Sequence, residues 1–495
     1  MQLKCRDIPA IIQGGMGVGV SGWQLARAVS QAGQLGVVSG TALDQVLARK
    51  LQLGDPDGHL RRAMASFPDP GIVHRIEDAF FSPAGKPPGE PFKAAPMFAL
   101  KMPGLLVELT IVAAFVEVFL AKEGHDKPIG INLLEKIQLP NIFSIYGAML
   151  AGVEFIFMGA GIPNEIPGLI DRLTGHLDVS LKINIQGAKP DQCRLEFSPR
   201  SFIKNPSALK RLKRPFFAPI ISSATLARMM LKKANGVIDG FVVEAYSAGG
   251  HNAPPRGRLL LSEKGEPVYG VRDEIEIEAF KPLGLPFWLA GSWGTPQKLS
   301  KALSLGAHGI QAGTVFAFCK ESGISEPLKT QVIQSILSGE ASVLTDALAS
   351  PTNFPFKVLC LENTLSERSE YTRRERVCDL GYLRDLYAAS DGRIGYRCPA
   401  EPVGSYVRKG GTSDAVKEKK CLCNALFSNI GLGQFRKNGY VEKALITAGK
   451  AILSFADLLK DRHSYSAGDV VNWLLSHDCR EYPLFSAVEN LRLEP

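Results

Sequence analysis

Cysteine is scarce in this sequence, and the cysteines present follow no recognised pairing or metal-binding pattern. Nine occur in 495 residues, and the N-terminus has no basic segment followed by an apolar core. Both features favour a reducing compartment, so we expect a cytoplasmic protein. Six cysteines lie in the last third of the chain, and four of these are the candidates for a metal site: Cys378, Cys398, Cys421 and Cys423. Their spacing lacks C-x2-C knuckles, so we expect buried thiols and no metal, with a zinc or iron–sulfur site as the alternative.

Long uninterrupted apolar runs are also absent. The most apolar stretch, residues 105–120 (LLVELTIVAAFVEVFL), contains Glu108 and Glu117. It is shorter than the roughly 20 apolar residues that cross a bilayer. We therefore expect a buried helix at this position and no membrane partner.

The chain has no large excess of one charge. Its 57 Lys and Arg residues exceed the 49 Asp and Glu residues by eight, and they are scattered apart from residues 210–214 (KRLKR) and 417–420 (KEKK). Such short runs are typical of solvated faces, or they attract an anionic cofactor. We expect no nucleic-acid partner. Docking of an acidic partner protein is the alternative for residues 210–214.

Short apolar runs alternate with helical patterns over the first two thirds of the chain. The runs that we expect to be strands are residues 9–13, 35–38, 128–132, 153–157, 217–222, 240–243, 286–290 and 309–311. Helical patterns separate most of them, including residues 141–151, 164–173, 224–233 and 295–305. Eight strand–helix units predict an α/β protein with a closed parallel (β/α)8 barrel, the TIM-barrel fold.

We expect the barrel over residues 1–324, with a mostly helical extension over residues 325–495 packed on it. Insertions are expected at about residues 45–127 and 180–214. The second insertion contains two alternating runs that predict a hairpin outside the barrel, residues 180–186 and 194–197. In the extension, helices are expected at residues 328–337, 441–459 and 467–476.

Glycine-rich turns follow five of the eight expected strands. The first turn, GGMGVG at residues 14–19, does not have the spacing of a dinucleotide fingerprint, and no acidic residue ends the second strand. A Rossmann fold is therefore not expected. Ser21 is expected to cap the helix that follows this turn. Ser222-Ser223 has no identifiable histidine or acid at triad spacing, so a hydrolase is not expected.

Residues 239–257 (DGFVVEAYSAGGHNAPPRG) are the expected centre of an active site, because strand ends converge at one face of a parallel barrel. The glycine pair lets a ligand approach the backbone, and His251 can exchange a proton near neutral pH. A tight turn with a surface histidine is the alternative for this stretch alone. The turns at residues 291–294 and 312–314 can direct N–H groups at a phosphate. The amides of three residues are candidates to hydrogen-bond a flat heteroaromatic ring: Gln13, Asn132 and Gln311.

Four motifs together resemble one enzyme family. Residues 9–40 (PAIIQGGMGVGVSGWQLARAVSQAGQLGVVSG), AGGH at 248–251, AGSWG at 290–294 and LGAHGIQAGTVF at 305–316 are similar, in order and spacing, to the FMN-dependent nitronate monooxygenases. The resemblance spans roughly residues 8–320. HNAPPRG, after the glycine pair, resembles a long-chain bacterial subgroup. The same superfamily contains FMN-dependent enoyl-(acyl-carrier-protein) reductases, and these motifs do not separate the two activities.

The resemblance implies an FMN site and a role for each matching position. The backbone of Gly14, Gly15 and Met16 would lie against the flavin ring. Asn132 would bind the ring edge or the ribityl chain, and His251 would be the catalytic acid or base. Gly249 and Gly250, the glycine pair within residues 239–257, would also belong to the cofactor site. The phosphate side would be held by Gly250, Gly291, Ser292, Gly313 and Thr314.

Two positions depart from the family pattern. Glu244 stands where the family often has glutamine, and Ser292 stands where it often has glycine. A carboxylate beside the flavin would disfavour an anionic reduced ring. Pairing of Glu244 with Arg256 or with the backbone is therefore an alternative to a role as ring ligand.

The resemblance implies a flavin-dependent oxidoreductase that converts alkyl nitronates and O2 into a carbonyl compound and nitrite. The alternative activity is NAD(P)H-dependent reduction of enoyl thioesters, which would bring an acyl carrier protein as a partner. A scaffold protein that keeps the barrel without turnover is a third hypothesis. Beyond the small-molecule substrate, a second copy of the chain is left open as a partner in a homodimer.

Overall fold

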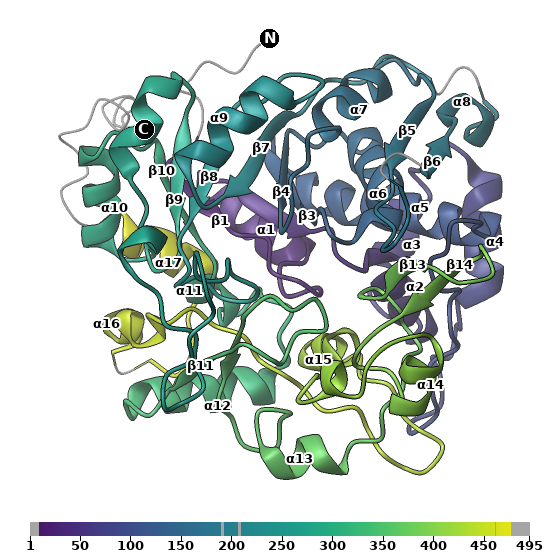
Figure 1. The fold of residues 1–495 in the computed structure, drawn as a ribbon. Helices are drawn as coiled ribbons and strands as arrows, with labels where there is room; N and C mark the ends of the chain where they lie inside the picture. Colours follow the sequence, from purple (N-terminus) through teal and green to yellow (C-terminus); the bar gives the residue numbers. More distant parts are fainter. Residues whose placement is uncertain (1–8, 190–192, 206–208, 461, 477–495) are drawn as a thin grey trace.

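A closed barrel of eight parallel strands organises the computed structural model, which describes residues 9–189, 193–205, 209–460 and 462–476 (Figure 1). The order around the barrel is β1-β10-β9-β8-β7-β4-β3-β2, and Ile12 bridges Leu35 to complete the circle. The strands are β1 (Ile11–Gln13), β2 (Gly36–Ser39), β3 (Ile129–Leu134), β4 (Phe155–Gly159), β7 (Phe216–Ile221), β8 (Phe241–Glu244), β9 (Phe287–Ala290) and β10 (Gly309–Ala312). The predicted (β/α)8 barrel is confirmed.

The barrel strands are apolar on both faces because each face packs on a different core. Side chains that point inward form a separate cluster around Phe155, Phe157 and Trp288. Trp288 is fully buried, and its indole N–H donates to the carbonyl oxygen of Pro9 at 3.1 Å. Outward-facing side chains join the main core beneath the surrounding helices. This double burial explains why the strands read as continuous apolar runs and not as alternating ones.

Helices surround the barrel and form its first insertion. Those that follow barrel strands are α1 (Trp23–Gln31), α6 (Gln138–Leu150), α7 (Ile166–Leu173), α9 (Ala224–Lys233) and α10 (Pro296–Ser304). The insertion after β2 contains α2 (Leu43–Gln52), α3 (His59–Met64), α4 (Pro70–Phe80) and α5 (Gly104–Lys122).

Helix α5 is long and apolar enough to cross a membrane by composition, but in this structure it is mostly buried among helices. It packs against α1, α2, α3, α4 and α6. A Cβ atom at Gly147 of α6 would lie 2.0 Å from the carbonyl oxygen of Ile111, so only glycine permits this approach. The buried Glu117 carboxylate accepts from the Trp23 N–H at 2.9 Å and pairs with Lys50. The predicted buried helix is confirmed.

The predicted hairpin in the second insertion is also present. Strands β5 (Val179–Lys182) and β6 (Arg194–Phe197) pair antiparallel in a sheet of their own, and α8 (Pro199–Phe202) follows. Residues 190–192 and 206–208 of this insertion lie outside the described part of the chain.

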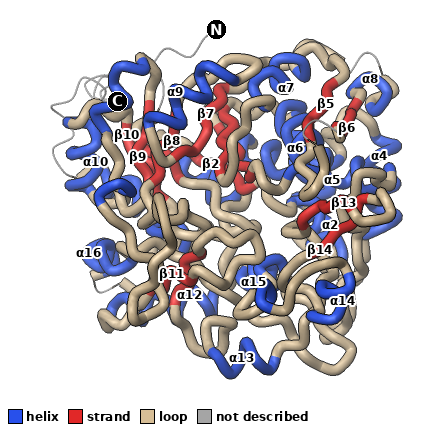
Figure 2. Tube along the Cα trace, viewed as in Figure 1, coloured by secondary structure: helices blue, strands red, loops and turns tan. Residues whose placement is uncertain are grey.

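The chain after β10 lies against one end of the barrel, where it contains more loop than helix (Figures 1 and 2). Its elements are α11 (Thr314–Ala317), α12 (Glu326–Leu337), β11 (Val343–Asp346), β12 (Phe356–Leu359), α13 (Arg368–Arg373), β13 (Asp385–Ala388), β14 (Ile394–Arg397), α14 (Val403–Arg408), α15 (Leu422–Asn429), α16 (Ala456–Leu459) and α17 (Ala467–Leu474). Sequence reasoning did not anticipate the antiparallel pairs β11–β12 and β13–β14. Helix α17 returns to pack against α1 and α10.

The helix predicted at residues 441–459 is wrong over most of its length. Residues 441–449 form no helix, and only a 3-10 turn (Ile452–Phe455) and α16 follow. The backbone of this segment bonds to other elements instead. Leu445 exchanges hydrogen bonds with the Asn429 side chain, and Ile446 accepts from Leu359 of β12. These tertiary bonds replace the helical ones.

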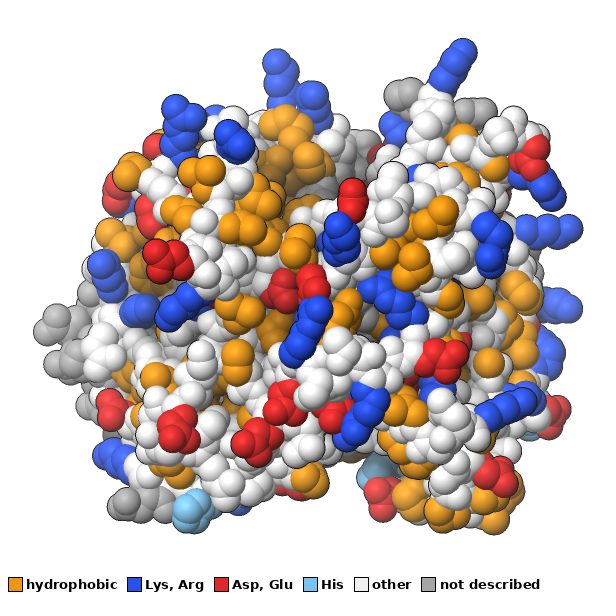
Figure 3. Space-filling view, turned by 60° about the horizontal axis from the view of Figure 1, so that its bottom comes forward, with side chains coloured by type: hydrophobic (Ala, Val, Ile, Leu, Met, Phe, Trp, Pro, Cys, Tyr) orange, Lys and Arg blue, Asp and Glu red, His pale blue; other side chains and the backbone are white. Residues whose placement is uncertain are grey.

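Charged side chains of both signs are interspersed on the face shown in Figure 3. No single-sign field dominates this view, which agrees with the scattered charge of the sequence.

Candidate active site

A cavity of about 530 Å³ opens at the carboxyl ends of the barrel strands. This volume lies within the range of about 300–1,000 Å³ that is typical of small-molecule sites. The structure brings to its wall all twelve residues singled out from the sequence: Gly14, Gly15, Met16, Asn132, Glu244, Gly249, Gly250, His251, Gly291, Ser292, Gly313 and Thr314.

The glycine turn after β1 is held by two buried side chains. Ser21 Oγ accepts from the Met16 N–H at 2.9 Å and donates to the carbonyl oxygen of Gly14 at 3.1 Å. The Gln13 amide donates to Ser21 Oγ at 2.8 Å. Helix α1 is instead capped by Gly22. Two sequence expectations are therefore wrong: Ser21 does not cap the helix, and the buried Gln13 amide is not available to a ring ligand.

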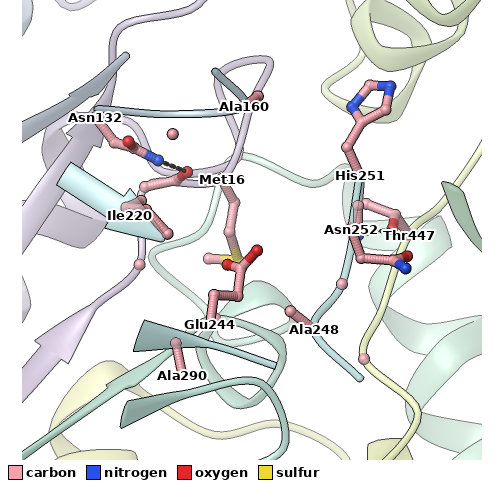
Figure 4. A pocket seen from close by; sticks show the side chains of 18 of the residues that line it. Met16, Asn132, Ala160, Ile220, Glu244, Ala248, His251, Asn252, Ala290 and Thr447 are labelled. Carbon is pink, nitrogen blue, oxygen red and sulfur yellow. Dashed lines mark hydrogen bonds between the residues drawn. The ribbon is translucent and has the colours of Figure 1, made fainter. Parts of the chain in front are cut away.

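Asn132 supports the same turn and keeps one acceptor free. Its Nδ2 donates to the carbonyl oxygen of Gly15 at 3.0 Å (Figure 4). A Cβ atom at Gly15 would lie 2.4 Å from the Cβ of Asn132, so Gly15 is required by this protein contact. The Asn132 Oδ1 atom is buried and has no hydrogen-bond partner within the described residues. A ligand N–H in the cavity could satisfy it.

The turns after β9 and β10 present peptide N–H groups without protein acceptors. Within the described residues, the backbone N–H groups of Ser292, Gly294 and Gly313 form no hydrogen bond with the protein. The Lys298 ammonium, from the first turn of α10, donates to the carbonyl oxygen of Ser292 and adds positive charge beside them. Free amides next to a lysine suit an anion such as a phosphate.

Ser292 occupies a left-handed backbone conformation, with φ of 60°. Glycine adopts this conformation without steric cost, whereas other residues do so rarely. The backbone conformation therefore favours glycine over serine at this position. The Ser292 hydroxyl offers little compensation, because its bond to the carbonyl oxygen of Ser247 is 3.5 Å long.

The C-terminal part of the chain forms the opposite wall of the cavity. Thr447 Oγ1 accepts from the Gly250 N–H at 2.6 Å, and the Gly449 N–H donates to Thr314 Oγ1 at 2.8 Å. A Cβ atom at Gly249 would lie 3.1 Å from the carbonyl carbon of Ala448. The N–H of Gly250 is therefore engaged by the protein itself, and Thr314 Oγ1 already accepts one protein hydrogen bond. Sequence reasoning missed these partners because they lie more than a hundred residues away along the chain.

His251 lines the cavity, but its ring is tied to the C-terminal part of the chain. Its Nε2 lies 2.6 Å from Ser350 Oγ, and its ring packs edge-on against Phe356 at 4.8 Å. In Figure 4 the imidazole points away from the side chains of Met16 and Glu244. Burial, aided by the charge of Lys136, holds the pKa of His251 well below its usual value. The imidazole is therefore uncharged at neutral pH.

Glu244 ends β8 and faces the cavity (Figure 4). Burial raises the pKa of its carboxyl group to about 7, against the opposing effect of Lys357. The Lys357 ammonium itself donates to the carbonyl oxygen of Tyr246 at 2.7 Å and to Asn252 Oδ1 at 3.0 Å. The alternative of a pair with Arg256 is not seen, because the Arg256 guanidinium donates to the carbonyl oxygens of Arg272 and Ser222. The Arg256 backbone N–H donates to the Asp273 carboxylate.

The four candidate cysteines of the extension, Cys378, Cys398, Cys421 and Cys423, gather around one small void. Cys398 and Cys421 are buried, with Cys378 and Cys423 packed against them. Burial raises the pKa of the Cys421 thiol. Among the residues that the structure describes, no group of three or more His, Cys, Asp or Glu side chains has the arrangement of a metal site.

Comparison with known proteins gives one family match and several partial relatives. Residues 194–346 match the family model described as nitronate monooxygenase. A probable nitronate monooxygenase of Bacillus subtilis (strain 168) is 32% identical over 128 residues, which are 26% of this chain and 35% of that protein. The (3aS,4S,5R,7aS)-5-hydroxy-7a-methyl-1-oxo-octahydro-1H-indene-4-carboxyl-CoA dehydrogenase of Mycobacterium tuberculosis (strain ATCC 25618 / H37Rv) is 29% identical over 159 residues, which are 32% of this chain and 39% of that protein.

Among solved structures, FabK from Thermotoga maritima aligns with a TM-score of 0.45 and 15% identity, covering 99% of this chain and 96% of that one. The chain spans little more than a third of the length of the curated relatives it matches. The family match includes β8, β9 and β10 with the turns that follow them, and so most of the cavity residues described above. Over residues 194–346, the chain is similar to the nitronate monooxygenase family.

Proposed function

We propose that the protein is an FMN-dependent oxidoreductase that oxidises alkyl nitronates with O2 to a carbonyl compound and nitrite. One observation carries this proposal. One cavity is lined both by the turns after β9 and β10, whose N–H groups can bind an anion, and by the glycine turn after β1. His251 and Glu244 lie on its wall. The family match covers β8, which ends at Glu244, and the turn after it, which carries His251.

The residues present fit a flavin mononucleotide. The free N–H groups of Ser292, Gly294 and Gly313, beside Lys298, suit its phosphate. The orphaned Asn132 Oδ1 suits an N–H of the ring, and the Gly14–Met16 turn offers backbone for the ring to lie against. The bound flavin would accept electrons from the substrate and react with O2. We propose FMN over FAD because the free N–H groups of the turns after β9 and β10 suit one phosphate.

The chain's own residues orient the nitronate and, where the substrate arrives as the neutral nitroalkane, remove its proton. A neutral nitroalkane must lose the proton next to its nitro group, and the uncharged His251 imidazole is the proposed base. Ser350 fixes the orientation of that ring through Nε2. Thr447 and Gly449 of the C-terminal part line the cavity and bond to Gly250 and Thr314 of the barrel turns. We propose a division of the chain into a barrel (residues 1–324) and an extension (residues 325–495), and residues of both parts form the site.

Reduction of an enoyl thioester is the second candidate. The Mycobacterium tuberculosis relative is named as a dehydrogenase of a carboxyl-CoA compound. Apolar side chains such as Leu134, Ile137 and Ile162 line part of the cavity, where an acyl chain would fit. In this case NAD(P)H would supply the electrons, and an acyl carrier protein would be a candidate partner.

Anaerobic reduction of the purified flavoprotein separates the two activities. We expect propyl-2-nitronate to bleach the flavin absorption band, and we expect nitrite to form once air is admitted. Bleaching by NADPH, with no response to the nitronate, would contradict the first proposal and favour the reductase. A homodimer, if formed, would be seen by light scattering in the same preparation.

A further inference from the structure

A buried ammonium group without a partner lies beside the cavity, at a residue that sequence reasoning did not single out. Lys136 sits in the short turn between β3 and α6, and its near neighbours Leu134 and Ile137 line the cavity. The Lys136 Nζ atom is buried and forms no hydrogen bond within the described residues. Buried polar groups nearly always have a partner, so this exception calls for an explanation.

Within the part of the chain that the structure describes, no carboxylate compensates this ammonium. Its Nζ lies 4.9 Å from the centre of the Phe354 ring, and Phe354 lines the cavity. Its charge helps to keep the pKa of His251 low, which places the two groups in one electrostatic environment. Burial alone raises the pKa of the adjacent Glu135, so this carboxyl group does not pair with Lys136.

Stability gives no reason for such an arrangement. An ammonium group loses hydration on burial, and a cation–π contact recovers only part of that free energy. Burial lowers the pKa of Lys136 to about 7 with no opposing effect from an acid. Perturbed ionisable groups beside a cleft cluster at functional sites. A ligand with negative charge would supply what the protein lacks here.

We propose that Lys136 binds the anionic oxygens of the substrate, the O–N–O group of a nitronate. The identity of the ligand rests on the function proposed above, whereas the anion site itself rests on the unpartnered ammonium. Lysine carries three donors on a flexible four-carbon stem, so Nζ can turn from the Phe354 ring toward the cavity. Its proximity to His251 then keeps the substrate carbon on the side of the proposed base.

Calorimetric titration with nitrate tests the anion site directly, because nitrate is a planar oxyanion that is not turned over. The full-length protein is compared with Lys136→Met, which keeps a similar volume without charge, and with Lys136→Arg, which keeps the charge. Lys301→Met, on the exposed face of α10, is the matched control. A charged hydrogen bond is lost, so we expect nitrate binding to weaken about tenfold to a hundredfold in Lys136→Met alone. Wild-type protein that binds no nitrate, or equal binding by Lys136→Met, would overturn the proposal.

Thermal unfolding separates this role from a structural one. Removal of an unpaired buried charge should leave the melting temperature of Lys136→Met unchanged or raised, although nitrate binding is lost. A lowered melting temperature would show that Lys136 supports the fold, and would count against the proposal.

Nitronate kinetics distinguish failure of this inference from failure of the proposed function. With Lys136→Met we expect KM for the nitronate to rise about tenfold or more while flavin content is unchanged. If the wild-type protein binds nitrate through Lys136 but oxidises no nitronate, the anion site stands and the proposed function fails. If nitronate oxidation proceeds and KM is unchanged in Lys136→Met, the proposed function stands and the role of Lys136 in substrate binding fails.

Discussion

His251 Nε2 lies 2.6 Å from the Oγ of Ser350, a residue 99 positions further along the chain. The two side chains come from different parts of the fold, because His251 follows barrel strand β8 and Ser350 lies between β11 and β12. The hydrogen bond makes the proposed base of the barrel depend on the C-terminal part of the chain.

His251→Ala should slow the oxidation of a neutral nitroalkane by about 10²- to 10⁴-fold, the usual contribution of a general base. A nitronate already lacks the proton, so its oxidation should slow far less. Stopped-flow reduction of the flavin with each substrate measures the two rates. Equal losses with both substrates would show that His251 acts in something other than proton removal.

Ser350→Ala should lower the rate with the nitroalkane by about tenfold, because one hydrogen bond that orients the imidazole is lost. The exposed Ser338→Ala change is a control that should have no effect. We expect kcat to fall, whereas the affinity for nitrate at Lys136 should not change. A Ser350→Ala enzyme with wild-type kcat would mean that the ring orientation does not depend on this bond.

Glu244→Gln should stabilise the flavin-free protein at high pH. Burial raises the folded-state pKa of Glu244 to about 7 from 4.5, so the folded state binds the proton more tightly than the unfolded state. The wild-type protein therefore loses stability relative to Glu244→Gln as pH rises from 4.5 to 7. We expect a gap on the order of 1–3 kcal/mol above that range. Melting curves from pH 5 to pH 8 test this, and a gap that does not change with pH would contradict it.

Ser292→Gly should stabilise the protein by up to about 1 kcal/mol. The left-handed conformation at this position costs a serine about 1–2 kcal/mol, which glycine avoids. Part of this gain is offset because glycine loses more backbone entropy on folding. The helical, exposed Ser304→Gly change should instead destabilise by about 0.5–1 kcal/mol. Urea unfolding of both variants measures the difference. Destabilisation by Ser292→Gly would mean that its hydroxyl contributes more than its long hydrogen bond suggests.

The barrel could be predicted from sequence because its signals are local. Buried runs such as residues 153–157 and glycine turns such as residues 291–294 mark strand ends without reference to the rest of the chain. Helix α9 (Ala224–Lys233) has the predicted bounds because Ser223 caps it. The twelve candidate residues meet at one cavity because parallel strands carry their carboxyl ends to one face.

The rest depends on partners that a local pattern does not reveal. Residues 441–449 have a helical composition, but hydrogen bonds to Asn429 and to the barrel turns hold them in an irregular conformation. The sequence predicts a ligand contact for Gln13 and a helix cap for Ser21, whereas their side chains bond to each other and to the glycine turn. Lys136 carries no motif at all, and only its burial without a partner draws attention to it.

The account rests on a flavin in the cavity at the carboxyl ends of the strands. The most direct test is the absorption spectrum of the full-length protein after incubation with FMN and removal of the free cofactor by gel filtration. We predict oxidised-flavin bands that elute with the protein in equimolar amount and weaken when Lys298, beside the free N–H groups of the phosphate turn, is changed to Met. A colourless protein peak would contradict the central claim.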